Sequence, residues 1–263
     1  MVTSNGYVLD ESPRRLGELR PVPDAERDDR EALWARLRRE GYLWLRGLLD
    51  PGGVREFRDF YFAHVDPELP RGDQRAALFG RVVPGPEYAD FCAQPAVRDW
   101  YAWFLGGETF LHRRKILRHT RPGESGVGTA TQAHYDLVYL REGTDRVLSS
   151  WIPLGDCPVE LGGLVYLERS HVRVLAAEAA GTLKRPAASI TADLPALAEE
   201  YDARWLLADY AAGDMVVHSA HMVHASLDNT AATYRLSTDI RYQRADEPID
   251  WRWQEHWHDL DGL

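Results

Sequence analysis

A histidine and an aspartate stand two positions apart in the segment 131–136, Thr-Gln-Ala-His-Tyr-Asp. The surrounding residues favour a β-strand, in which side chains at i and i+2 share a face, so His134 and Asp136 are predicted to point into one cavity. An imidazole and a carboxylate are two of the three ligands of a 2-His-1-carboxylate facial triad, which leaves iron(II) three open positions for oxygen chemistry. The alternative is a surface ion pair, since His-x-Asp pairs also arise by chance.

Three later histidines could supply the third ligand: His218, His221 and His224. We favour His224, because the turn-forming residues 228–230 can bring the segment around Arg235 back beside it. An arginine at that place could bind a carboxylate through two parallel hydrogen bonds. Ser226 shares a strand face with His224 and could donate to the same carboxylate. His218 and His221 are expected to be packed histidines or to lie behind the ligands.

The elements that must position these residues are helical in the N-terminal third. We predict helices over 24–40, from Pro51 onward and over 95–105, and a short strand over 42–46. Asp24 and Asp50 are the expected N-caps, and glycines end the first and third helices. The stretch 66–86 is punctuated by proline and glycine, so we expect it to be irregular.

From Glu108 onward the sequence favours β-structure. Candidate strands are 108–118, 132–140, 146–153, 163–168, 205–210, 215–219, 221–227 and 233–243. Eight short strands after a helical third predict a mostly β fold, a jelly roll buttressed by helices. Residues 172–204 interrupt the strands as an alanine-rich insertion with helical pieces, and such insertions often act as lids.

One domain is expected to span the whole chain, 1–263. Its predicted parts are an extended arm (1–23), a helical support (24–107), a jelly-roll core with the insertion (108–245) and a C-terminal tail (246–263).

The composition excludes several classes of function. The formal net charge is −10 and no basic tract offsets it, so binding to nucleic acid or to an anionic membrane is not expected. No run of about 18 apolar residues could cross a membrane. The N-terminal residues are polar and lack the apolar core of a signal peptide. The two cysteines, Cys92 and Cys157, are far apart, and we expect reduced thiols in a cytoplasmic protein.

These features together resemble the phytanoyl-CoA dioxygenase (PhyH) family of iron(II)/2-oxoglutarate-dependent oxygenases. The matching pieces are His134-Tyr-Asp136, Trp151-Ile-Pro-Leu, Leu161-Gly-Gly-Leu-Val-Tyr, Ser170-His171, Gly213-Asp214, His224-Ala-Ser226 and Arg235. The opening Gly41-Tyr-Leu-Trp-Leu-Arg-Gly-Leu-Leu49 also resembles the family's first helix and strand. In order, the pieces span roughly residues 30–245.

The resemblance implies a double-stranded β-helix with iron(II) held by His134, Asp136 and His224. It also implies that 2-oxoglutarate chelates the iron and places its distal carboxylate on Arg235 and Ser226, with dioxygen as the oxidant. Trp151 matches a family tryptophan beside the cosubstrate, although a core aromatic on a strand is an equal alternative. Looser candidates for contacts to cosubstrate or substrate are Arg81, His112 and Arg118.

The implied reaction is hydroxylation of an unactivated C–H bond with release of succinate and carbon dioxide. The same scaffold could instead catalyse desaturation, epimerisation or oxidative cyclisation. A non-oxygenase alternative is a metal-binding jelly roll of the cupin type, or a pseudoenzyme that only binds a ligand. Arg235 argues against it, because a simple cupin has no need of a carboxylate anchor. The carboxylate of Asp136 occupies the position that a halide would need, which disfavours halogenation.

Two departures from the family pattern bear on the substrate. Glu168-Arg169 precede Ser170-His171 where the family usually has Pro-Gly, which predicts altered loop geometry. The chain has only Lys115 and Lys184 as lysines, few to meet the phosphates of a coenzyme A thioester. We expect a small organic substrate, such as a natural-product intermediate, with segments 66–86 and 172–204 bordering the cavity mouth. The sequence gives no indication of an oligomeric state.

Overall fold

Helix α1 (Arg30–Glu40) begins later than the sequence pattern predicted. A single 3₁₀ turn occupies Asp24–Glu26, and the N-cap is Asp29, whose side chain accepts a hydrogen bond from the Ala32 amide. The helix ends where expected, at Gly41, which adopts the left-handed conformation with φ +83°. The computed structural model describes residues 1–261 except 141, 185 and 187.

Two further helices begin where predicted, and the second of them, α5, also ends there. Helix α2 (Pro51–His64) is capped by Asp50, which accepts from the Gly53 amide, and α5 (Pro95–Leu105) ends at the left-handed Gly106. Proline at the first helical position suits both, because its missing N–H would have no partner there.

The prediction that 66–86 is irregular is wrong. Helix α3 (Arg71–Ala77), a π-helical turn (Leu78–Val82) and α4 (Pro86–Cys92) fill most of it. Pro70 and Pro86 stand at helix beginnings, and Gly72 and Gly80 face open space, so none of these breakers interrupts a helix. Burial of side chains such as Val82 against the core then favours helical structure in this stretch.

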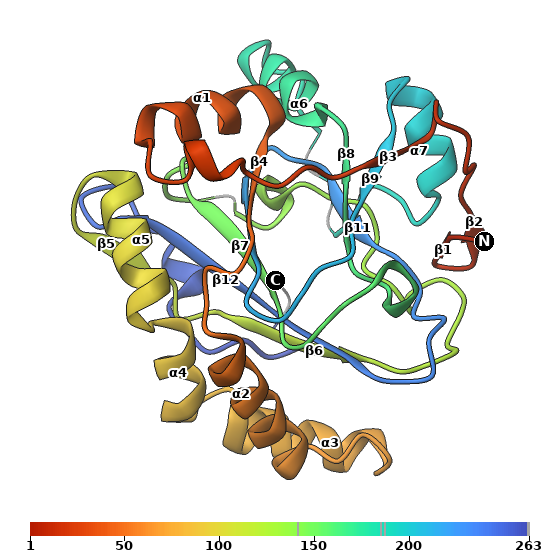
Figure 1. Cartoon of the computed structure of the whole chain (residues 1–263), viewed down its shortest axis with the longest axis vertical. Coiled ribbons are helices and arrows are strands. Elements are labelled where there is room, and N and C mark those ends of the chain that lie inside the picture. The colour runs from red at the N-terminus through yellow and green to blue at the C-terminus, as the bar shows by residue number, and fades with distance from the viewer. Residues whose placement is uncertain (141, 185, 187, 262–263) are drawn as a thin grey trace.

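Two sheets face one another behind these helices (Figure 1). The larger has the order β4 (Tyr42–Leu45), β10 (Met215–Ser219), β7 (Leu148–Pro153), β12 (Arg235–Arg244) and β5 (Thr109–Leu111), with β6 (Ile116–Thr120) also pairing with β12. The smaller has the order β11 (His224–Ser226), β8 (Leu164–Leu167), β9 (Trp205–Leu207) and β3 (Leu16–Glu18). The chain also forms a short hairpin of β1 (Thr3–Ser4) and β2 (Tyr7–Val8). The expected arm, 1–23, adds strand β3 to the smaller sheet, where it pairs with β9.

The predicted strand 132–140 is not a strand. Ala133 and His134 each make one isolated bridge, to Thr191 and His224, and a 3₁₀ turn begins at Asp136. The predicted strand 108–118 is divided into β5 and β6. The insertion is helical, as expected, with α6 (Ser170–Ala179) and α7 (Leu194–Tyr201).

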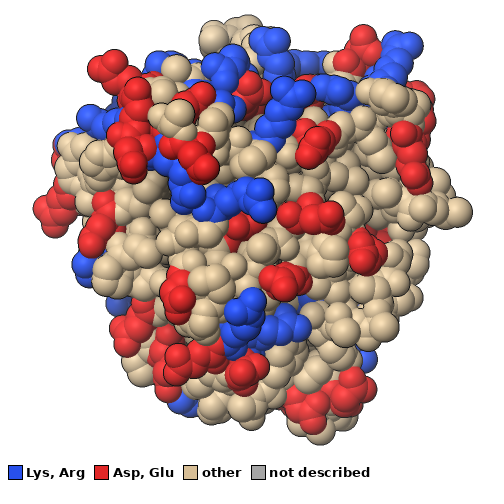
Figure 2. Space-filling view, in the orientation of Figure 1, with Lys and Arg blue, Asp and Glu red and all other residues tan. Residues whose placement is uncertain are grey.

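The core lies on both faces of the larger sheet. Helices α2, α4 and α5 pack their apolar side chains on its outer face, with Leu43, Ile152 and Ile240 among the sheet residues they cover. Between the sheets, a cluster that includes Trp44 and Tyr166 fills one part of the space. No helix among the described residues is long and apolar enough to span a membrane. On the face shown in Figure 2, acidic and basic side chains are interspersed.

Asp214 should be a major determinant of stability. Its buried carboxylate accepts hydrogen bonds from the indole N–H of Trp44 and from the amides of Gly47 and Ala211, which ties β4 and the turn after it to the beginning of β10. Replacement by alanine leaves the buried indole N–H of Trp44 unpaired and removes two part-buried hydrogen bonds from amides. We therefore expect the free energy of unfolding, measured by urea denaturation, to fall by about 2–4 kcal/mol. Asp209→Ala, which removes one exposed contact to the Val159 amide, is the matched control and should change it by less than about 1 kcal/mol. Equal losses in the two variants would contradict the assignment.

Candidate metal centre

His134 and His224 are joined through their backbones. The amide of each donates to the carbonyl of the other, at N···O distances of 3.0 and 2.9 Å. This antiparallel bridge places the two imidazole rings side by side, with centroids 4.2 Å apart. His134 and His224 therefore line one cavity, although the partner of His134 is β11 and no regular strand runs through 132–140.

The orientation of both rings leaves the same nitrogen available. Nδ1 of His134 lies 2.9 Å from the Gln132 carbonyl, and Nδ1 of His224 lies 2.9 Å from the Met222 carbonyl. A carbonyl can only accept, so Nδ1 carries the proton and the lone pair is on Nε2. The two Nε2 atoms lie 3.7 and 3.9 Å from Oδ1 of Asp136. Backbone carbonyls that fix the tautomer of a histidine in this way are characteristic of metal ligands.

Asp136 is completely buried and is held as an anion. Its carboxylate accepts a hydrogen bond from the Ser149 hydroxyl and lies 3.4 Å from Nη2 of Arg241. Burial opposes ionisation, but the charge of Arg241, with His218 and His224 beside it, holds the pKa of Asp136 well below its usual range. Burial favours the neutral form of a histidine, so it lowers the pKa of His134 and of His224. The site therefore offers two neutral imidazoles and one carboxylate at neutral pH.

These three donors fit a divalent transition metal. One ligand atom from each of His134, Asp136 and His224 lies within 4.8 Å of the others, and all three residues are buried. Two imidazoles and a carboxylate are the donor set of iron(II) oxygenases, in which the remaining coordination positions serve the reactants. His218 lies behind the site, hydrogen bonded to Tyr166, and His221 contacts Glu178, so neither belongs to this group of ligands.

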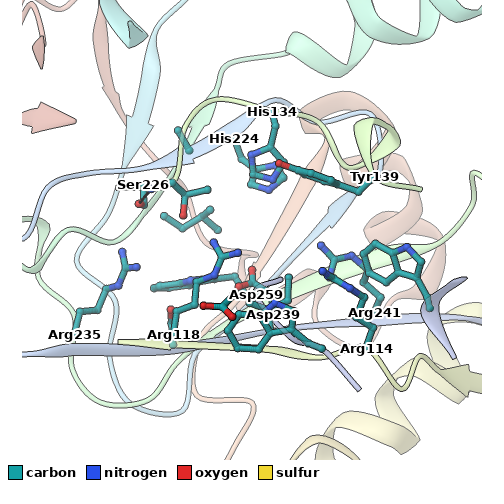
Figure 3. A pocket seen from close by; sticks show the side chains of 18 residues that line it. Arg114, Arg118, His134, Tyr139, His224, Ser226, Arg235, Asp239, Arg241 and Asp259 are labelled. Atoms are coloured by element: carbon teal, nitrogen blue, oxygen red, sulfur yellow. Dashed lines mark hydrogen bonds between the residues drawn. The ribbon is translucent and has the colours of Figure 1, made fainter. Parts of the chain in front are cut away.

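A cavity of about 170 Å³ opens beside the three ligands, between the two sheets (Figure 3). Arg235 and Ser226 line one end, and the guanidinium of Arg235 is 97% buried and donates to the Gly162 carbonyl. Its Nε has no partner among the described residues. The Ser226 oxygen accepts from the Thr131 amide, which leaves its hydroxyl proton available to a ligand.

The looser candidates divide into two groups. Trp151 and Arg118 line the cavity, as proposed from the sequence. The structure does not bring Arg81 or His112 there. Arg81 pairs with Glu87 and lies over Phe60, and His112 is hydrogen bonded to Gln243.

The sequence analysis missed other cavity residues on β12. Ser237, Asp239 and Arg241 lie on the same face as Arg235 and line the cavity with it. The alternation of a strand could have identified them once Arg235 was placed.

The C-terminal tail forms part of the cavity wall, which the sequence did not indicate. Trp253, Trp257 and Asp259 line the cavity. Phe79, which packs against Trp257, and Arg75, which pairs with Asp259, hold the tail to the α3 region. None of the described residues in 66–86 or 172–204 lines the cavity itself, and the expectation that these segments border its mouth stays a prediction.

Comparison with known proteins identifies the family. Residues 37–237, most of the chain, match the family described as phytanoyl-CoA dioxygenase (PhyH). The chain belongs to this family. Curated proteins similar to it include the 1-deoxypentalenic acid 11-beta-hydroxylases of Streptomyces exfoliatus and Streptomyces arenae, which are 26% and 25% identical to it. Each match covers 83% of this chain and 82% of the relative.

Solved structures share the fold of this PhyH protein. The alpha-ketoglutarate-dependent carbocyclase SnoK from nogalamycin biosynthesis is 21% identical, with a TM-score of 0.62 over 87% of this chain and 88% of its own. The epimerase SnoN, in complex with Fe³⁺, alpha-ketoglutarate and nogalamycin RO, is 23% identical, with a TM-score of 0.61 over 83% and 84%. Family and relatives together make this protein an iron- and 2-oxoglutarate-dependent oxygenase.

Replacing any one of His134, Asp136 and His224 by alanine should abolish iron(II) binding. Removing a residue that hydrogen bonds to a metal ligand lowers metal affinity about 10- to 100-fold, so removing the ligand itself should lower the affinity by more than about 100-fold. His221→Ala is the control, because its side chain contacts Glu178 outside the three-ligand group. Anaerobic calorimetric titration with iron(II) measures the effect, with circular dichroism to verify folding. An equal loss in the His221 variant would show that the wrong histidine has been chosen.

Proposed function

We propose that His134, Asp136 and His224 hold iron(II), and that the protein hydroxylates an unactivated C–H bond of a small organic molecule. The observation that supports this most directly is the arrangement of the cavity. Three side chains that could ligate a metal lie together, two of them in the cavity wall, and a buried arginine with an unpartnered nitrogen lies at one end of the cavity. We also propose that the two facing sheets form a double-stranded β-helix within a single domain, whose C-terminal tail covers the cavity.

Arg235 and Ser226 would bind the distal carboxylate of 2-oxoglutarate. The guanidinium is buried, charged and only partly satisfied by the Gly162 carbonyl, and an unpaired donor in this environment favours a carboxylate ligand. Trp151 would provide a flat apolar wall beside the cosubstrate. When bound, iron(II) and 2-oxoglutarate supply the means to activate dioxygen, with succinate and carbon dioxide as coproducts.

The protein's own side chains would act by fixing the metal ligands in position and by limiting access of water to the cavity. The hydrogen bonds to Gln132 and Met222 fix the two rings, and Ser149 and Arg241 fix the carboxylate of Asp136. No side chain needs to exchange a proton with the substrate in such a reaction. Trp253 and Trp257 cover the cavity and would limit access of water.

Hydroxylation is the outcome we favour. The curated relatives are named as hydroxylases, and both act, by their names, on an acid. Desaturation, epimerisation and oxidative cyclisation are alternatives on the same scaffold, and the titles of the solved structures include an epimerase and a carbocyclase. Which outcome follows would depend on where the cavity places the substrate C–H bond.

A metabolite screen tests the function. The iron-loaded protein is incubated in air with 2-oxoglutarate and a small-molecule extract, and masses are compared with incubations that lack 2-oxoglutarate. We expect a product heavier by one oxygen, whereas a product lighter by two hydrogens would indicate desaturation or ring formation. Absence of succinate formation, with or without extract, would instead indicate a metal-binding protein that is not an oxygenase.

Arg235→Ala should weaken binding of 2-oxoglutarate while iron binding persists. Removing one partner of a buried, charged hydrogen-bonded pair costs roughly 2–5 kcal/mol, which corresponds to about 1.5 to 4 orders of magnitude in affinity. Lysine should restore only part of it, because it offers a point charge without the two parallel donors. The measurement is an anaerobic titration of 2-oxoglutarate into the iron-loaded protein, followed by the metal-to-ligand charge-transfer band.

Arg146→Ala is the matched control for this variant. It removes an arginine whose exposed side chain pairs with Glu247. We expect unchanged affinity for 2-oxoglutarate. If Arg235→Ala behaves like this control, the assignment of the carboxylate anchor is refuted.

A further inference from the structure

Four arginines of the described part of the chain line the cavity: Arg114, Arg118, Arg235 and Arg241. Three of them already have a use. Arg114 pairs with Asp261, Arg241 lies against the metal-ligating Asp136, and Arg235 is the proposed anchor of the cosubstrate. The side chain of Arg118 has no hydrogen bond and no ion pair within the described part of the chain, only the ring of Trp257 at 5.7 Å from its guanidinium carbon. A cation that lines a cavity without an anionic partner is available to bind an anion there.

The position of Arg118 differs from that of Arg235. It lies on β6 directly opposite Ser237 of β12, two positions along the strand pair from Arg235, which lies opposite Thr120. Arg235 is 97% buried, whereas Arg118 remains exposed although it lines the cavity. In Figure 3, its side chain rises into the cavity between Arg235 on one side and Arg241 on the other. Arg118 therefore lies where a ligand would enter, next to the C-terminal tail.

We propose that Arg118 binds a carboxylate of the substrate, so that the oxygenase acts on a small organic acid. This inference rests on the proposed function, because it assumes that 2-oxoglutarate occupies the end of the cavity at Arg235. Of the two carboxylates of 2-oxoglutarate, one would bind the metal and the other would bind Arg235. Neither is left for Arg118, whereas a substrate carboxylate at the cavity mouth would meet its guanidinium.

The charges of the cavity favour an anion. Iron(II) would be balanced by the two charges of 2-oxoglutarate, Asp136 by Arg241, Asp261 by Arg114 and Asp259 by Arg75. Among the described residues, Arg235 and Arg118 then remain with Asp239, which lies diagonally across the strand pair from Arg118. Burial raises the pKa of Asp239, so at least one positive charge is in surplus, and a carboxylate would neutralise it.

The geometry also specifies the orientation of the acid. Its carboxylate would lie on Arg118 under Trp257, and its apolar body would extend past Ile116 and Tyr139 toward the metal ligands. The cavity volume of about 170 Å³ is below the 300 Å³ or more that is usual for small-molecule sites. Since Trp257 and Asp259 form the wall on this side, the tail would have to shift to admit such a substrate.

The test uses matched pairs of small alicyclic carboxylic acids and their primary amides, beginning with cyclohexanecarboxylate and cyclohexanecarboxamide. Each is titrated anaerobically into the protein loaded with iron(II) and saturating 2-oxoglutarate, and binding is followed through the charge-transfer band and by calorimetry. The wild type should bind the acids about 10- to 100-fold more tightly than the amides, which corresponds to the free energy of one hydrogen-bonded pair of charges. Arg118→Met should remove that preference, and Arg118→Lys should restore part of it.

Arg113→Met is the control, because it removes the same charge from an exposed position outside the cavity lining. It should retain the preference for acids. The proposal is overturned if the wild type does not prefer acids, if Arg118→Met still does, or if Arg118→Met weakens 2-oxoglutarate as strongly as Arg235→Ala. The last result would make Arg118 a cosubstrate ligand. A wild type that forms no charge-transfer band at all would refute the proposed function, which distinguishes the two failures.

A second arm needs no chosen ligand. Treating the metabolite extract with a methylating reagent converts its carboxylic acids to methyl esters. We expect the mass change seen with the untreated extract to disappear, whereas its persistence after complete esterification would show that the substrate is not recognised through a carboxylate.

Discussion

The pair of backbone hydrogen bonds between His134 and His224 determines where the chemistry can occur. It joins a loop after β6 to strand β11 of the smaller sheet, two segments 90 residues apart in the sequence. Because each histidine donates and accepts across the same bridge, the two side chains emerge together. The carbonyls of Gln132 and Met222, each two residues before a histidine, then turn both rings in the same way. The positions of the two proposed nitrogen ligands are thus fixed by the main chain, which makes them little dependent on side-chain packing.

The third proposed ligand, Asp136, is subject to a different constraint, because it is a buried charge. Removing a carboxylate from water is costly unless polar groups replace the solvent. Asp136 receives that compensation from Ser149 on β7 and Arg241 on β12, neighbouring strands of the larger sheet. Arg241 is itself stacked on Trp253, at 4.4 Å from the ring centroid, so the C-terminal tail supports the metal site through it. A cation bound between the ligands would relieve the remaining cost, which is consistent with a site organised before metal arrives.

Sequence reasoning succeeded where the physical determinant is local. Asp50 before Pro51, Gly41 and Gly106 determine helix boundaries by themselves, and the run 215–219 matches β10 residue for residue. It failed where distant segments decide. Prolines and glycines in 66–86 suggested irregular chain, but they stand at helix beginnings or face solvent, and packing on the core favours helix. The alternation around His134 suggested a strand, yet no neighbouring strand pairs with 132–140 beyond single bridges. The role of Trp253 and Trp257 depends on contacts with Arg241, Arg118 and Phe79, which no local pattern contains.

Strand β12 connects the requirements of the site. It is the longest strand, ten residues, and it pairs with β7 on one side and with β5 and β6 on the other. Such a doubly paired strand holds its alternate residues at fixed spacing, about 6.8 Å for every two residues. Arg235, Asp239 and Arg241 therefore lie in one row, with the proposed cosubstrate anchor at one end and the support of the metal ligand at the other. An anchor on a flexible loop would have to be ordered each time 2-oxoglutarate bound, at a cost in conformational entropy. Rigid placement in a sheet avoids that cost and fixes the distance between the metal and Arg235, so the length of the diacid itself can be selected.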